Sequence, residues 1–345
     1  MANASLAFDI RQRVLRSATN LFTPDAKGIF AGSGFLWLSL ATLRVLPALA
    51  IYLLPSRVNR YQHAAGSWAL ITGSSDGIGF ALAEELSRRG FNVILHGRNP
   101  DKLAAVSSNL SAKFPNRNYK VLVADAAAFP RTAEAYEELL QPIKDLNITI
   151  LVNNVGNVGA VTERPIKPLS EWPHDELDTL VNINLTFTLH ITKAMLPILQ
   201  RHQPSLIVNV GSVAAAGLPY LETYSGTKAF LKSWSRGLGI ELNIGEKRDI
   251  EVLHVEVGEV STPSNPMPGV AFKTDATTFS KALVDKMGWK LGSVTAWWGH
   301  LMFSRVLPAM PEWLFGKTMG PMMRGRSMRD LPRVDHFKWD RKKDM

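Results

Sequence analysis

The feature that most constrains this fold is the alternation of short apolar segments with longer helical segments between residues 67 and 255. The apolar segments are 68–72, 92–96, 119–124, 148–152, 205–210 and 250–255. The helical segments between them are 77–89, 101–113, 133–144, 176–202, with an interruption expected near Pro197, and 223–243. Strands that are apolar throughout are typical of a parallel sheet covered on both faces. The alternation therefore predicts an α/β fold with a doubly wound parallel sheet.

A glycine-rich turn, TGSSDGIG at 72–79, connects the first predicted strand to the first helix. Glycines let the backbone approach a pyrophosphate, which then rests on the helix N-terminus. The turn predicts a dinucleotide site of the Rossmann type. The turn residues that we expect to contact the cofactor are Gly73, Ser75, Asp76, Gly77, Ile78 and Gly79.

The end of the second strand indicates which dinucleotide binds. An acidic residue there usually holds the ribose 2′-hydroxyl of NAD, but this strand ends in His-Gly-Arg-Asn, with Arg98 and no acid. A guanidinium can pair with the 2′-phosphate of NADP(H), so we predict that cofactor. The alternative is that Arg98 is a surface arginine. Asp125 should lie near the adenine, and Asn153 and Gly156 should line the crevice where ligands bind.

Tyr224 and Lys228 lie four positions apart and share one face of a predicted helix. An unperturbed phenol has a pKa near ~10, and an ammonium beside it lowers that pKa, so the pair can act as an acid and base. Ser212 follows the fifth strand and can donate to a carbonyl oxygen. Asn184, inside a helix, suits a structural or water-holding role.

These motifs resemble those of the short-chain dehydrogenase/reductases over about residues 67–262. The resemblance implies that Tyr224 is the general acid, Lys228 lowers its pKa and holds the nicotinamide ribose, Ser212 orients the substrate carbonyl, and Asn184 secures a relay water. It also implies that Val260 and Thr262 contact the cofactor's carboxamide. One departure is Val257, where the family usually has proline.

Further features resemble the family's membrane-bound branch, which holds very-long-chain 3-oxoacyl-CoA reductases and related 17β-hydroxysteroid dehydrogenases. They are NNVG at 153–156 and hydrophobic segments at both ends. The resemblance implies NADPH-dependent reduction of a ketone on a lipid, with 3-oxoacyl-CoA in fatty-acid elongation as the first choice. One alternative is a steroid or secondary-metabolite ketone reductase. Another is a catalytically silent, membrane-anchored binding protein.

Five regions follow from composition: a basic segment 1–27, a membrane anchor or hairpin 28–54, the catalytic domain 67–262, a substrate loop with hydrophobic helices 263–323, and a basic tail 324–345. The net charge of +9 resides in the ends, because 66–299 holds 22 basic and 23 acidic residues. Basic ends beside apolar segments favour membrane lipids as partners and argue against nucleic acid. Arg44 and Pro47 leave a single span and a hairpin both open.

The chain ends Lys342-Lys343-Asp344-Met345, which resembles the dilysine signal of endoplasmic-reticulum membrane proteins. With a cytosolic reductant as cofactor, this predicts an endoplasmic-reticulum membrane protein whose catalytic domain faces the cytosol. The sequons at Asn109, Asn147 and Asn184 should then stay unmodified. No metal site is predicted. A homo-oligomer and partners in an elongation complex are both left open.

Overall fold

The computed structural model describes residues 51–327 apart from 64–65, 160, 163, 245–248 and 264–271, together with Arg13, Gly28, 31–35 and Ser39. The chain divides into two compact units, Met1–Leu54 and Pro55–Met345. Every element discussed below belongs to the second unit. The predicted anchor at 28–54 falls largely outside the described residues. Within the described residues, no helix combines the length and apolar character that a bilayer crossing needs.

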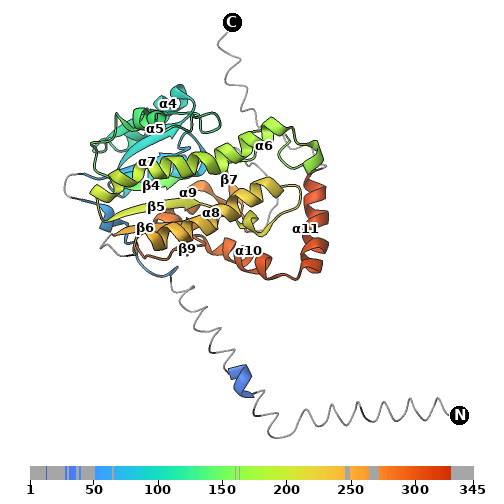
Figure 1. Cartoon of the computed structure of the whole chain (residues 1–345). Helices are drawn as coiled ribbons and strands as arrows, with labels where there is room; N and C mark the ends of the chain where they lie inside the picture. The colour runs from blue at the N-terminus through green and yellow to red at the C-terminus, as the bar shows by residue number, and fades with distance from the viewer. Residues whose placement is uncertain are drawn as a thin grey trace, which may run out of the picture. The chain divides into compact units, whose positions relative to one another are not determined.

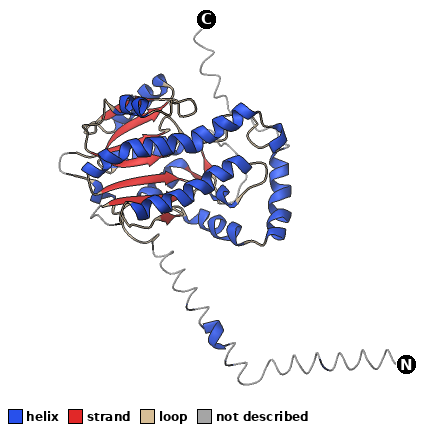
Figure 2. Cartoon of the chain, in the orientation of Figure 1, coloured by secondary structure: helices blue, strands red, loops and turns tan. Residues whose placement is uncertain are grey.

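Seven parallel strands form the main sheet, in the order β3-β2-β1-β4-β5-β6-β9 (Figures 1 and 2). They are β1 (Trp68–Thr72), β2 (Asn92–Gly97), β3 (Tyr119–Val123), β4 (Ile148–Asn153), β5 (Ser205–Val210), β6 (Ile250–Val255) and β9 (Ser293–Val294). The strand order reverses between β1 and β4, so the crevice for a ligand opens at the carboxyl ends of these two strands. The predicted doubly wound sheet is confirmed.

Helices cover both faces of this sheet (Figure 1). They are α3 (Gly77–Arg88), α4 (Pro100–Lys113), α5 (Ala133–Leu140), α6 (His174–Val181), α7 (Phe187–Arg201), α8 (Glu222–Glu241) and α9 (Ala276–Val284). One core cluster joins alternate strand residues such as Ile71 to α3, α4 and α9. The other joins Leu70 and its equivalents to α5, α7 and α8. Because successive strand residues face opposite sides, strands that are apolar throughout supply both clusters.

The chain continues beyond the sheet with α10 (Trp298–Ala309) and α11 (Glu312–Ser327), which Figure 1 shows in red. A second, two-stranded sheet pairs β7 (Val260–Ser261) with β8 (Thr274–Asp275). This pairing holds both ends of the loop that the sequence predicted at 261–275, where 264–271 lie outside the described residues.

Two expectations about individual elements were wrong, and one strand was missed. The long helix is broken at the π-helical segment η3 (Asn182–Thr186), whereas Pro197 lies inside α7. The reason is local: the Asn184 side-chain amide donates to the Leu180 carbonyl at 3.0 Å and so competes with the regular ladder. At the edge, β3 leaves Val121 and Val123 exposed, so it is not covered on both faces. Strand β9 was not expected.

Candidate functional site

The glycine-rich turn after β1 approaches the backbone that follows β4. A side chain at Gly73 would lie 3.1 Å from Val155 Cα, and one at Gly77 would lie 3.2 Å from Thr262 Cγ2. Both glycines have positive φ, 66° and 56°. A Cβ at Gly79 would overlap the Gly73 carbonyl oxygen at 2.1 Å. The three glycines therefore keep the backbone open at the start of α3, where a pyrophosphate can rest.

Other residues predicted for the turn have structural contacts. Asp76 caps α3 by accepting a hydrogen bond from Gly77 N at 2.6 Å. Ile78 packs against the first core cluster. Val260, in β7, is buried, and Thr262 lies against Gly77 across the opening of the turn. The loop after β6 thus returns to the turn after β1, which brings the predicted pyrophosphate and carboxamide contacts to one place.

The end of β2 lies next to the same turn. A Cβ at Gly97 would lie 3.5 Å from Ser75 Oγ, which places Ser75 beside the strand end. Arg98 follows directly and is exposed, and no acidic side chain in the described part of the chain pairs with it. Asp125, beyond β3, accepts from Ala127 N at 3.0 Å. A free guanidinium at this strand end suits a 2′-phosphate.

The last residue of β4, Asn153, and the next residue, Asn154, hold the sheet edge together. Asn153 donates to Thr192 Oγ1 and to Asn209 Oδ1, both at 2.8 Å. Asn154 donates to the carbonyl of Thr72 at 3.0 Å and to that of Gly73. These bonds fix the strand ends around the crevice. The predicted cofactor contact of Asn153 stays a prediction.

Tyr224 and Lys228 share the inward face of α8, as predicted. The Lys228 ammonium lies over the Tyr224 ring, 5.6 Å from its centroid, and donates to the Val210 carbonyl at 3.0 Å. Only 3% of Lys228 is exposed. Burial lowers the pKa of Lys228 from 10.5 to about 8, because the charged form loses its hydration.

Ser212 lies within hydrogen-bond reach of the Tyr224 phenol. Burial raises the pKa of Tyr224, the hydrogen bond with Ser212 lowers it, and the Glu259 carboxylate raises it again. The Ser212 hydroxyl also accepts from Ala214 N at 3.1 Å, which caps the short helix η4 (Val213–Ala216) and fixes the side chain. Two hydroxyl groups therefore face one point at the carboxyl edge of the sheet.

Asn184 reaches this point from the π-helical segment. Its amide nitrogen is bonded to Leu180, whereas its buried Oδ1 has no partner in the described part of the chain. A Cβ at Gly156 would lie 2.7 Å from that Oδ1 and 3.3 Å from Lys228 Nζ. A glycine is therefore required between the two groups. A buried acceptor without a donor suits a bound water.

The residues present fit a nicotinamide dinucleotide. The open glycine turn, the free arginine after β2 and the Tyr–Lys pair lie along one crevice. Across the sheet from β2 to β5 the arginine comes first, the glycine turn second and the Tyr–Lys pair last, which is the order in which NADP(H) presents its 2′-phosphate, pyrophosphate and nicotinamide ribose.

A sequence profile described as short chain dehydrogenase matches residues 67–267. The chain belongs to this family. It is an oxidoreductase, as predicted, and the four groups of the site lie together, which argues against a catalytically silent relative. The predicted cofactor, NADP(H), is supported by the family and by solved relatives that hold NADP.

Several fungal relatives are named very-long-chain 3-oxoacyl-CoA reductase. The one from Emericella nidulans is 33% identical over 84% of this chain and 85% of its own length. The one from Coccidioides immitis is 34% identical over 90% of each chain. The predicted resemblance to this branch is confirmed.

Solved structures share the fold. A short chain dehydrogenase from Burkholderia cenocepacia in complex with NADP is 27% identical, with a TM-score of 0.56, over 69% of this chain and 97% of its own. A 7beta-hydroxysteroid dehydrogenase has a TM-score of 0.62 and 21% identity, over 77% of this chain and 100% of its own. The fold of this chain is therefore the fold of these solved dehydrogenases.

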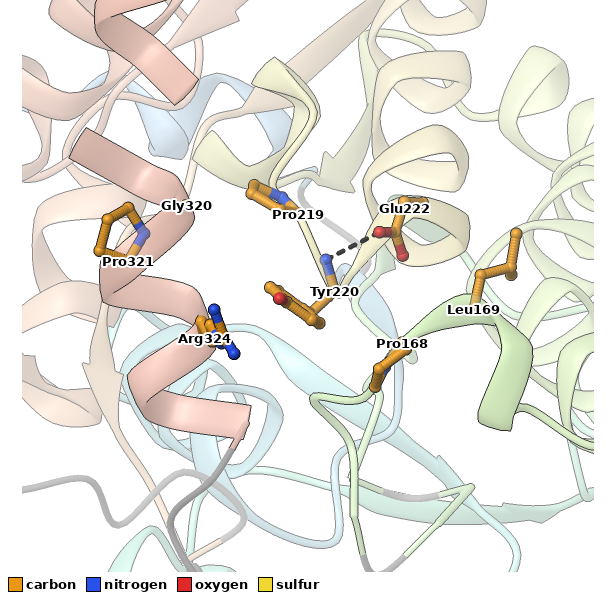
Figure 3. Close-up of a pocket in the computed structure, with 8 residues that line it drawn as sticks. All are labelled: Pro168, Leu169, Pro219, Tyr220, Glu222, Gly320, Pro321 and Arg324. Carbon is orange, nitrogen blue, oxygen red and sulfur yellow. Dashed lines mark hydrogen bonds between the residues drawn. The ribbon is translucent and has the colours of Figure 1, made fainter. Parts of the chain in front are cut away.

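Sequence reasoning missed two features at this site. Arg326, near the end of α11, pairs with Glu259 in the loop after β6, with Nη1 and Oε1 3.2 Å apart. A cleft of about 550 Å³ lies beside the start of α8 (Figure 3). Its lining residues are Pro168, Leu169, Pro219, Tyr220, Glu222, Gly320, Pro321 and Arg324. Both features join segments that lie far apart in the sequence, a separation that no local pattern reveals.

Proposed function

We propose that this protein reduces the ketone of a 3-oxoacyl-CoA to the 3-hydroxyacyl-CoA with NADPH, in fatty-acid elongation. The observation that carries the proposal is the meeting of Ser212, Tyr224, Lys228 and Asn184 at one edge of the sheet. The names of the fungal relatives support the acyl-CoA substrate.

NADPH supplies the hydride when it is bound. The Tyr224 hydroxyl donates the proton to the substrate oxygen, and Ser212 donates a hydrogen bond to the same oxygen. The Lys228 ammonium, 5.6 Å from the centroid of the Tyr224 ring, is the nearby cation that would stabilise the phenolate that remains. The Asn184 Oδ1 accepts from a water that can return a proton to the site.

The test is an assay of the purified full chain with NADPH against 3-oxoacyl-CoAs of increasing chain length and a panel of ketosteroids. We expect the long 3-oxoacyl-CoAs to give the highest kcat/KM. Tyr224→Phe should lower turnover on the order of 100-fold or more, with NADPH affinity largely kept. Preference for ketosteroids would overturn the substrate, and near-normal turnover by Tyr224→Phe would overturn the role of the phenol.

We further propose that the protein resides in the endoplasmic-reticulum membrane with its catalytic domain facing the cytosol. The apolar stretch 28–54, the basic ends and the terminal Lys342 and Lys343 support this. Protease added to intact microsomes should digest the catalytic domain, and carbonate should leave the protein in the membrane. Protection from protease, or glycosylation at Asn109, would contradict the topology. A homo-oligomer and elongation-complex partners stay predictions.

A further inference from the structure

The cleft beside α8 has apolar walls and a single basic side chain. Three prolines, Leu169 and the Tyr220 ring form most of its lining. In Figure 3, Arg324 extends from α11 on one side, and Tyr220 and Pro168 lie on the other. The start of α8 also lines the cleft through Glu222, two residues before Tyr224. Tyr224 is not part of the lining, but Leu221, which follows Tyr220 of the cleft wall, packs against the same apolar cluster as Tyr224.

Tyr220 is held in the cleft wall by an unusual backbone conformation. Its φ is 65°, a region that non-glycine residues rarely occupy. Two hydrogen bonds fix the turn: Tyr220 N donates to Glu222 Oε1 at 2.8 Å, and Leu218 N donates to Ser225 Oγ at 3.1 Å. Backbone strain of this kind persists at ligand sites because the surroundings enforce it. The bond to Tyr220 N also engages the one carboxylate of the cleft.

Arg324 differs from the other arginines near it. Arg326 pairs with Glu259, and Arg164 pairs with Glu171 at 2.6 Å. Arg324 pairs with no acidic side chain among the residues that the structure describes, and it is exposed in the cleft. A guanidinium presents a planar set of donors that matches a phosphate. An apolar cleft with one such group suits an extended ligand that carries a phosphate.

We propose that this cleft takes the carrier end of a thioester substrate and that Arg324 binds a phosphate of the carrier. This inference rests on the proposed reduction of 3-oxoacyl thioesters, and it adds how the carrier is recognised. Coenzyme A and the phosphopantetheine of an acyl carrier protein share this phosphate chemistry. Arg324 is a binding residue for the carrier and takes no part in proton transfer.

The test compares one 3-oxoacyl chain on three carriers: coenzyme A, 4′-phosphopantetheine and pantetheine, which lacks phosphate. The wild type should prefer the phosphorylated carriers. Arg324→Ala should lower kcat/KM for them by roughly 10- to 100-fold and leave the pantetheine thioester unchanged, as expected for the loss of one charge-assisted hydrogen bond. Arg324→Lys should restore part of the difference. A preference for coenzyme A over phosphopantetheine would place the bound phosphate on the nucleotide.

Lys317→Ala is the matched control, because it removes a cation from the same helix at a residue outside the cleft lining. It should leave kcat/KM for all three thioesters unchanged. Equal losses on all carriers in Arg324→Ala, or a wild type that treats the carriers alike, would overturn the role of Arg324 while the reductase function stands. Failure to reduce any 3-oxoacyl thioester, with turnover of other ketones, would instead overturn the proposed function and this inference together.

Discussion

The His300 ring of α10 fills the space above Gly258, where a Cβ would lie 2.6 Å from His300 Cδ2. The ring is itself held in place: Nε2 lies 3.1 Å from the Glu259 carbonyl, and Trp297 packs edge-on at 4.9 Å. Because a carbonyl only accepts, Nε2 carries the proton. Burial lowers the pKa of His300, so the ring is neutral near pH 7. The loop that carries Val257 in place of the family's proline is therefore supported from outside, by α10.

Gly258→Ala should destabilise the protein by about 1–3 kcal/mol, because the added methyl overpacks a fixed ring. It should also weaken NADPH binding, since the loop must shift. Thermal unfolding and cofactor titration measure the two effects. Adding His300→Ala should recover much of the loss if the contact is the cause. Gly237→Ala, in α8 with open space at its Cβ, is the control and should not destabilise.

Arg98→Ala should weaken NADPH binding by roughly 10- to 150-fold and barely change NADH binding, because only NADPH carries a 2′-phosphate. Fluorescence titration with both cofactors measures this. Arg98→Lys keeps the charge without the bidentate fork, so its affinity for NADPH should lie between that of the wild type and that of Arg98→Ala. Equal weakening of both cofactors would make Arg98 structural.

Lys228→Met should abolish turnover yet stabilise the cofactor-free protein at pH 7. The lowering of the Lys228 pKa from 10.5 to about 8 reflects roughly 3 kcal/mol against the buried charge. The variant also leaves the Val210 carbonyl without its donor, which offsets part of this gain. We therefore expect the free energy of unfolding to rise by about 1–2 kcal/mol.

The pH dependence has a definite sign for Lys228. Between pH 8 and 10.5 the unfolded chain binds the proton that the folded chain has lost, so wild-type stability rises with pH. The advantage of Lys228→Met in denaturant melts should therefore shrink from about pH 7 to about pH 10. Lys193→Met, an exposed lysine on α7, should show no such trend. A constant difference across this range would contradict a desolvated ammonium.

Glu259→Gln should lower the pKa of Tyr224, because the carboxylate raises it in the wild type. Reduction needs the protonated phenol, so the rate falls at high pH as the phenol ionises. In Glu259→Gln this fall should occur at a lower pH than in the wild type. Ser212→Ala should move this fall the other way, since the Ser212 hydrogen bond lowers the pKa. The pH profiles of kcat measure both shifts, and shifts of one sign in both variants would refute the assignment.

Local pattern was enough to predict the sheet and the shared helix face of Tyr224 and Lys228, whereas the catalytic roles of the four candidate residues came from the family resemblance and stay predictions. Strands β1, β5 and β6 have the predicted bounds, because each is a short, mainly apolar run between polar turns. Tyr224 and Lys228 met as expected because four residues make about one helical turn. These features depend on neighbours in the sequence.

The missed features depend on packing between distant segments. Gly258 and His300, and Glu259 and Arg326, are separated by 42 and 67 residues in the chain, and nothing local links them. The break in the long helix was misplaced because Pro197 was given more weight than Asn184, whose side chain takes a helical carbonyl. The exposure of β3 follows from its place at the sheet edge, which periodicity does not reveal.

The ion pair between Arg326 and Glu259 links α11, which lines the proposed carrier cleft, to the loop beside the glycine turn. Two residues earlier in the same helix, Arg324 lines the cleft, whereas Glu259 belongs to the loop that returns to the glycine turn. We expect a ligand that displaces the last turn of α11 to act on that loop through this ion pair, and the reverse. Coupling of this kind is reciprocal. We therefore expect heterotropic cooperativity, in which occupancy of one site changes the dissociation constant of the other by the same factor in both directions.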